Sequence, residues 1–174
     1  MAKYTLMQIA QKLMPKPVQS LGIKSVGNNN AGSNGTVDLP LSAPITLNGN
    51  AHYQLHIKVT ASMDDSYDVN TAFSMQAVLD GLKSNAISLN GFQNQKGFKS
   101  GTYEAIIDVP KGHSLSDINT ITFNRAGYKW GMLYLTISDI ELVNLDATSN
   151  VPHTVSGCLT VIADYVRSNF ESGG

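Results

Sequence analysis

Between about residues 37 and 145, apolar and polar residues alternate in short runs that are separated by turn-rich segments. Alternation with a period of two places successive side chains on opposite faces of a β-strand. Five runs share this pattern. Their apolar positions are Tyr53, Leu55, Ile57 and Val59; Phe73, Met75, Ala77 and Leu79; Tyr103, Ala105, Ile107 and Val109; Ile121 and Phe123; and Leu133, Leu135 and Ile137. Several alternating strands joined by such loops predict an all-β, antiparallel, two-sheet sandwich.

The last run changes phase. Its apolar series ends at Ile137 and resumes at Ile140, so the alternation slips by one residue at Ser138 and Asp139. A slip of one residue would move every later side chain to the other face of the sheet unless an extra residue is accommodated. We therefore predict a β-bulge at this point.

Apolar residues recur at helical spacing at both ends of the chain, in residues 4–14 and 153–174. Each end predicts a short amphipathic helix, and "MPKP" ends the first one. A two-sheet sandwich already buries its inner faces, so we expect the helices to be assembly devices that bind other proteins or other copies of this chain. Docking of the helices onto a sheet edge of the same chain is the alternative. The apolar positions are Leu6, Ile9 and Leu13 in the first helix and Leu159, Ile162, Val166 and Phe170 in the second.

The segment of residues 22–35 is rich in glycine and asparagine and predicts a linker, either a free arm or one held by a partner. The expected organisation is therefore an N-terminal helix and arm over residues 1–36, a sandwich over residues 37–145, and a C-terminal helix over residues 146–174.

Composition narrows the classes of partner. Only 14% of the 174 residues are charged and the net charge is −1, so nucleic acid and anionic membranes are disfavoured as partners. A surface rich in neutral polar side chains suits neutral partners such as glycans. Cys158 is the single cysteine, which excludes an internal disulfide and a multi-cysteine zinc site. The sequence shows no signal peptide and no run of about 20 apolar residues that would span a membrane.

Aromatic residues lie among glycines and polar residues in several predicted loops. Tyr128 and Trp130 occur in "AGYKWG", Tyr67 occurs in "MDDSYD", and Phe92 occurs in "LNGFQNQKGF". A flat aromatic ring can stack on the apolar face of a sugar, so Trp130, Tyr128 and Tyr67 are candidate carbohydrate-binding residues. The alternative is that Trp130 closes one end of the sandwich as a core residue.

The polar face of the predicted strand at residues 52–60 carries His52, Gln54, His56 and Lys58. The first three are candidate carbohydrate-binding residues of a polar sheet. The alternative is the solvated outer face that an antiparallel sheet normally has. The two histidines are four residues apart on a strand, roughly 13 Å, so they cannot share one metal ion.

The acidic turn "MDDSYD" offers carboxylates that could bind Ca²⁺ or could simply be solvated. It does not have the spacing of an EF-hand. Glycoside hydrolysis needs only two suitably placed carboxylates, but no pair is singled out. No serine or cysteine lies in a nucleophile-elbow sequence.

The run "INTITFNRAGYKWGMLYLTISDIELVN" resembles the closing strands of carbohydrate-binding modules with a galactose-binding-like jelly-roll fold. The resemblance covers roughly residues 37–145 and implies a jelly-roll sandwich. It also implies a structural Ca²⁺ bound through Asp139 of "SDIEL", with Glu141 as the alternative and Asp38 of "TVDLP" as the matching early ligand. An aromatic platform at Trp130 and Tyr128 is implied as well.

Modules of this type also occur on the baseplates and tails of phages that infect Gram-positive bacteria. Together with the weakly charged surface and the two terminal helices, the resemblance leads us to expect a non-enzymatic structural protein of a virion, an extracellular particle. We expect it to bind host cell-wall or surface polysaccharide and, through its helices, other virion proteins or further copies of itself as a homo-oligomer. Two alternatives are a decoration or connector protein that binds only virion proteins, and a glycan-active enzyme.

Overall fold

The computed structural model describes residues 5–14, 16–27, 29–31, 35–64, 74–89, 99–126, 132–147 and 154–170 of the 174-residue chain. The chain divides into two compact units. Val18–Leu145 form a β-sandwich, and Met1–Pro17 together with Asp146–Gly174 form a helical unit.

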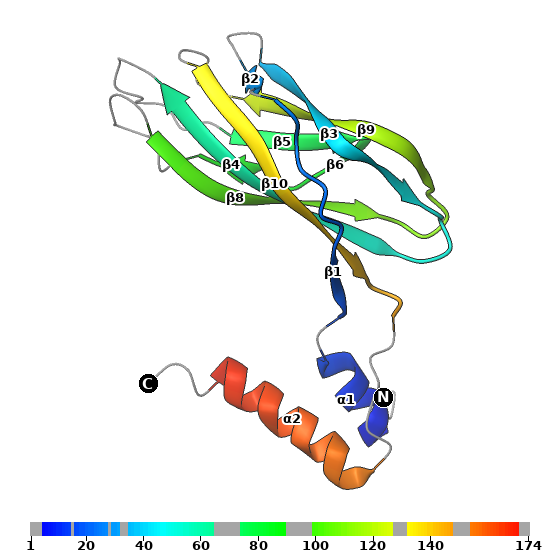
Figure 1. The fold of residues 1–174 in the computed structure, drawn as a ribbon. Helices are drawn as coiled ribbons and strands as arrows, with labels where there is room; N and C mark the ends of the chain where they lie inside the picture. The colour runs from blue at the N-terminus through cyan, green and yellow to red at the C-terminus, as the bar shows by residue number, and fades with distance from the viewer. Residues whose placement is uncertain are drawn as a thin grey trace. The chain divides into compact units, whose positions relative to one another are not determined.

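The sandwich consists of two antiparallel sheets (Figure 1). The first sheet contains β1 (Val18–Ser20), β2 (Asn29–Ala31), β4 (Tyr53–Asp64), β8 (Lys99–Val109) and β10 (Met132–Asn144). The second sheet contains β3 (Thr36–Leu47), β5 (Ser74–Leu79), β6 (Leu82–Lys83), β7 (Ile87–Ser88) and β9 (Leu115–Ala126). The predicted fold class, an all-β sandwich with a short helix near each end, is confirmed.

The order of the strands is that of a jelly roll. β1 and β2 pair with successive parts of the same edge of β10, because β4 occupies the other edge along its whole length. β6 and β7 likewise share one edge of β5, since β9 occupies the other. The strand order is therefore β1/β2–β10–β4–β8 in the first sheet and β3–β9–β5–β6/β7 in the second. Most connections between consecutive strands cross from one sheet to the other. Two four-position sheets connected in this way form the double Greek key of a jelly roll.

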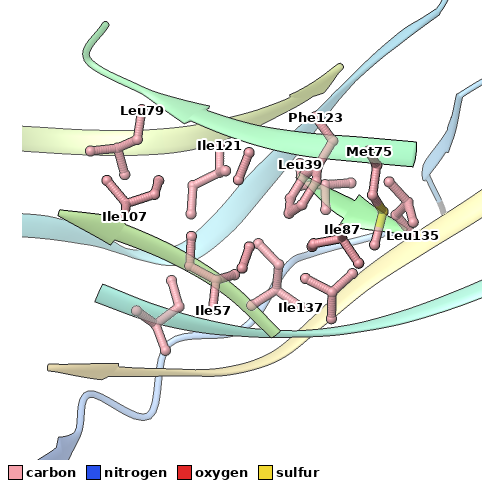
Figure 2. Close-up of a cluster of buried hydrophobic side chains, with 14 of the residues drawn as sticks. Leu39, Ile57, Met75, Leu79, Ile87, Ile107, Ile121, Phe123, Leu135 and Ile137 are labelled. Atoms are coloured by element: carbon pink, nitrogen blue, oxygen red, sulfur yellow. The ribbon is translucent and has the colours of Figure 1, made fainter. Parts of the chain in front are cut away.

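The core lies between the two sheets and is made by the alternating residues that the sequence pattern indicates. Leu55, Ile57 and Val59 of β4 are fully buried, as are Ile121 and Phe123 of β9 on the facing sheet. Figure 2 shows Ile57 and other side chains of the first sheet pointing toward Ile121 and Phe123 of the second. Burying each large aliphatic side chain stabilises the fold by about 1.5–3 kcal/mol, so this layer provides most of the driving force for folding.

The predicted bulge is confirmed. β10 pairs with β4 in one register up to Ile137 and resumes at Asp139, so Ser138 is the extra residue. The bulge keeps Ile140 on the inner face, where it is fully buried. Asp139 consequently lies on the outer face, opposite Lys58.

Residues 21–26 close one side of the sandwich by hydrogen bonding to both sheets. The N–H of Ser25 donates to the carbonyl of Ile137 in β10 (3.0 Å), and the N–H of Val26 donates to the carbonyl of Pro40 in β3 (2.8 Å). The sequence predicts a linker over residues 22–35, whereas the structure places β2 and this bridging segment there. The observed sandwich therefore begins at Val18 and not near residue 37.

The opposite side is closed in the same manner, between β5 and β8. The N–H of Ser84 donates to the carbonyl of Ala77 in β5 (2.9 Å), and the N–H of Asn85 donates to the carbonyl of Ile106 in β8 (3.3 Å). Unpaired strand edges invite pairing with other chains. Segments that bridge the two sheets remove part of that exposed edge on each side of the sandwich.

The helical unit contains α1 (Leu6–Leu13) and α2 (Val155–Phe170), which pack against each other. Thr5 begins α1 with a capping box, in which its hydroxyl accepts from the N–H of Gln8 (3.2 Å) and the Gln8 side chain accepts from the N–H of Thr5 (2.8 Å). Ala10 and Cys158 are the buried residues of the two helices. Both predicted helices are thus confirmed. Neither helix in the described part of the chain has the length and apolar character needed to cross a membrane.

Candidate functional site

The outer face of the first sheet collects the predicted polar residues. Alternation along β4 points Gln54, His56 and Lys58 outward, because Leu55, Ile57 and Val59 point into the core. The register places acidic residues of the two neighbouring strands beside them. We call the following set the polar face: His52, Gln54, His56, Lys58, Glu104, Asp108, Asp139 and Glu141.

Side chains of the polar face bind one another. His52 Nε2 lies 2.8 Å from Asp108 Oδ1, and His56 Nδ1 lies 3.2 Å from Glu104 Oε1. His56 Nε2 also lies 3.4 Å from Gln54 Oε1. A sugar hydroxyl on this face would compete with these contacts. The structure thus brings His52, Gln54 and His56 onto one surface, but as members of internal polar pairs.

Lys58 belongs to the same set of pairs. Its ammonium group donates to a Glu141 carboxylate oxygen. This hydrogen bond raises the pKa of Lys58 above its ordinary value, while partial desolvation lowers it and the negative charges of Glu141, Asp139 and Glu104 raise it further. The half-exposed ion pair contributes little to stability by itself, because water screens it.

Asp139 fastens the N-terminal edge strand to β10. Its two carboxylate oxygens accept from Ser20 Oγ at 2.9 and 2.8 Å, and one of them also accepts from the N–H of Ile140 at 2.9 Å. The bulge makes this contact possible by turning Asp139 outward. Ca²⁺ takes six to eight oxygen ligands. Among the described residues, no group of three or more His, Cys, Asp or Glu side chains is placed to hold a metal ion.

Asp38, the second predicted calcium ligand, lies in β3 of the other sheet. Its neighbours Val37 and Leu39 are buried, so Asp38 faces outward, where it accepts from Thr122 Oγ1 (2.6 Å). Asp38 and Asp139 therefore lie on opposite outer faces of the sandwich, with both sheets between them. Their positions do not support a calcium ion shared by the two, and the described residues around each carboxylate do not fit a calcium site.

Trp130, Tyr128 and Tyr67 lie outside the described residues, as do Asp65 and Asp68 of the acidic turn. The strand ends on either side of them are described. Met132, which starts β10, pairs with Asp64, which ends β4. The segment that carries Tyr128 and Trp130 and the segment that carries Tyr67 are therefore attached to adjacent, hydrogen-bonded strand ends.

Further strand ends meet at the same end of the sandwich, which we call the loop end (Figure 1). β8 starts beside the end of β4, where Lys99 pairs with Met63. β5 starts beside the end of β9, where Ser74 pairs with Ala126. The segments 65–73, 90–98 and 127–131 consequently all leave the described sandwich at the loop end.

Two residues with polar groups near the loop end were not among the candidate site residues predicted from the sequence. Arg125 follows Ile121 and Phe123 on the inner face of β9 and is only 7% exposed. The alternation of β9 could have indicated this, because residues 121, 123 and 125 share one face. A buried guanidinium is costly unless it is paired, so Arg125 marks a polar site at the edge of an apolar core.

Tyr103 is the second such residue. Its ring lies over Gly101 two positions earlier on β8, where an added Cβ would come within 2.8 Å of the Tyr103 hydroxyl oxygen. Gly101 thus leaves the space that the ring fills. Burial raises the pKa of Tyr103 above its ordinary value.

No family model matches the chain, and comparison with curated proteins gives no significant match. Solved structures with some likeness include the catalytic domain of Agl-KA, at 14% identity and a TM-score of 0.31, over 92% of this chain and 35% of that one. Another is the structure of infectious bursal disease virus Gx strain, at 11% identity and a TM-score of 0.33, over 74% and 31%. A third is the binding domain of Botulinum Neurotoxin DC in complex with SialylT, at 12% identity and a TM-score of 0.28, over 75% and 44%.

This chain thus spans less than half the length of each of these structures. Identities and TM-scores this low carry no argument about function.

Proposed function

We propose that this chain is a non-enzymatic structural protein of a virion whose jelly-roll sandwich binds host cell-surface glycans at its loop end. The observation that carries the proposal is the pairing of Met132 with Asp64. It joins the segment that contains Tyr128 and Trp130 to the strand end that leads to Tyr67. Aromatic residues on adjacent segments are the kind of platform on which a sugar ring stacks.

The loop end is favoured over the polar face because the polar face is already paired with itself. Its histidines contact carboxylates, its lysine contacts Glu141, and Asp139 accepts from Ser20. Breaking such contacts to admit a sugar would cost part of the binding free energy. The low content of charged residues also favours a neutral glycan over an anionic polymer.

The same contacts support the proposal that the protein is not an enzyme. A glycosidase needs one protonated and one ionised carboxyl group flanking the bond to be cleaved. The described carboxylates of the polar face are held by histidine, lysine or serine side chains on an open sheet surface.

A second candidate function is that of a decoration or connector protein that binds only other virion proteins. It is favoured by the helical unit, in which α2 exposes Val155, Leu159 and Phe170. Exposed apolar side chains of this size are typical of protein interfaces. In this case the sandwich would act as a rigid spacer and its loop end would bind no sugar.

The full-length chain tests the choice between the two functions. Immobilised cell-wall polysaccharide purified from Gram-positive bacteria is the probe, and a neutral glucan and an anionic polymer are the controls for specificity. Saturable binding to the cell-wall polysaccharide supports the glycan-binding function. Absence of binding to every polysaccharide, with the chain folded and incorporated into particles, would support the connector function.

A further inference from the structure

One face of α2 is apolar and exposed. Val155, Leu159, Val166 and Phe170 are 69%, 51%, 43% and 73% exposed, and the half-buried Ile162 lies between them along the helix. We call these five residues the α2 stripe. Successive members are three or four residues apart, so with about 3.6 residues per turn they form one continuous row along the helix.

The α2 stripe is distinct from the face of α2 that packs on α1. Cys158 is 3% exposed, and Leu13 and Met14 line a cavity of about 560 Å³ together with Val161 and Tyr165. On a helix, Val161 and Tyr165 point more than a quarter turn away from Leu159 and Val166. The contacts of α1 therefore account for the first face of α2, and the four exposed members of the α2 stripe are not covered by the described residues of their own unit.

The exposed parts of the α2 stripe amount to on the order of 400 Å² of apolar surface, comparable with the largest patch on a typical monomer. The largest patch on a monomer is often functional, and this one is confined to a single helix of 16 residues. The charged residues of α2 narrow the classes of partner that would fit this surface.

The described residues of α2 carry two charged side chains, Asp164 and Arg167, and these pair with each other at 3.1 Å. A membrane-surface helix would carry several lysines or arginines beside its apolar face. A helix that binds a charged partner would present a net charge. Because α2 presents neither, two identical stripes can approach each other without repulsion.

We infer that the α2 stripe is a homotypic interface, in which α2 of one copy packs along α2 of a second copy. The first four members are spaced by four, three and four residues, which is the pattern by which two helices pack side by side as in a coiled coil, and Phe170 follows one turn further on. An isologous contact of this kind joins the same patch on both copies and closes with two-fold symmetry. The apolar area is below the roughly 800 Å² per partner of a standard interface, so the association should depend on concentration.

Sedimentation velocity of the full-length chain, over roughly two decades of concentration, tests this inference. The wild type should shift from monomer to dimer as the concentration rises. The double variant Leu159→Gln/Val166→Gln should weaken the association at least about tenfold. The matched control Thr160→Gln introduces the same polar side chain at an exposed position, rotated by about 100° around the helix from Leu159. This control should associate like the wild type.

Far-ultraviolet circular dichroism and the melting temperature show whether each variant is folded. If the double variant loses helix content, Phe170→Ser provides the same test at the end of the helix, where the side chain is 73% exposed. A wild type that stays monomeric throughout would overturn the inference. Equal association of the wild type and the folded stripe variants, or equal loss in the Thr160→Gln control, would also overturn it.

Discussion

Met132 and Asp64 are paired across β10 and β4, at the position where the first strand starts and the second ends. Through this pair, two segments that are distant in sequence are attached to adjacent strand ends, one with Tyr67 and the other with Tyr128 and Trp130. A jelly roll brings alternate connections to the same end of the sandwich. We propose that aromatic residues from separate loops form one binding surface at this end.

A substitution at Ser84 tests how the side of the sandwich between β5 and β8 is stabilised. Its hydroxyl is buried, accepts from the N–H of Ala77 (2.9 Å) and donates to the carbonyl of Asn85 (2.7 Å). Ser84→Ala would leave a buried backbone donor without this partner, so we expect a loss of about 1–3 kcal/mol in the free energy of unfolding. Denaturant unfolding measures this loss. Ser88→Ala, at an exposed position of β7, is the matched control and should change stability by less than about 0.5 kcal/mol. Equal effects of the two variants would contradict the role of Ser84.

A substitution at Asp139 distinguishes a structural role of this residue from a metal-binding role. Because Ser20 and the backbone of Ile140 already bind its carboxylate, we expect Asp139→Ala to cost about 1 kcal/mol through lost hydrogen bonds. EDTA should leave the melting temperature of the wild type unchanged. A fall in melting temperature with EDTA in the wild type, absent in Asp139→Ala, would instead show that the calcium ion implied by the resemblance is bound at this residue.

We predict that ionisation of Tyr103 lowers the stability of the folded chain at alkaline pH. Burial raises the pKa of Tyr103 in the folded chain above the value of about 10 that applies in the unfolded chain. Below pH 10 Tyr103 is protonated in both the folded and the unfolded chain. It therefore contributes no pH dependence to the free energy of unfolding in that range. Above pH 10 the unfolded state loses its proton first, and the free energy of unfolding falls as the pH rises.

Denaturant unfolding of the wild type and of Tyr103→Phe between about pH 8 and pH 11 measures this effect. The difference in stability between the two proteins should stay constant up to about pH 9.5 and then shift in favour of Tyr103→Phe. A constant difference over the whole range would show that Tyr103 ionises equally in both states.

The N-terminal edge strand gives a prediction about truncation. Residues 18–145 should fold with a cooperative transition, because they include β1, β2 and the bridging segment of residues 21–26. Residues 36–145 lack these elements and leave one edge of β10 unpaired. We expect this shorter chain to be markedly less stable and to aggregate. Thermal unfolding and light scattering of the two truncated chains provide the comparison. Equal stability would show that residues 18–35 are only an arm.

The inner faces and the bulge could be predicted from the sequence because their signal is local. Each strand has its own alternation of apolar and polar residues. The change of phase between Ile137 and Ile140 shows that one extra residue is present. The edge strand could not be predicted in this way. Val18–Ser20 are all exposed and show no alternation. They pair through backbone hydrogen bonds, which side-chain patterns do not report.

The polar contacts depend on register, and this explains which parts of the candidate site could not be predicted. Asp139 and Ser20 are 119 residues apart in sequence, and His52 and Asp108 are 56 apart. Nothing in a single strand indicates which partner the neighbouring strand will place opposite. The sequence therefore indicates that His52 and His56 share a face, but not that each is paired with a carboxylate. Trp130, Tyr128 and Tyr67 remain predictions.

Trp130 provides the most direct test of the proposed glycan-binding site. It is the single tryptophan of the chain, so its fluorescence in the full-length protein reports events at this residue alone. Titration with cell-wall polysaccharide purified from Gram-positive bacteria should change this fluorescence in a saturable manner. In parallel, calorimetric titration should show that Trp130→Ala weakens binding at least about tenfold, while its melting temperature stays within about 2 °C of the wild type. Unchanged affinity in Trp130→Ala, or a loss of roughly 3–5 kcal/mol of stability as for a buried core residue, would contradict the account.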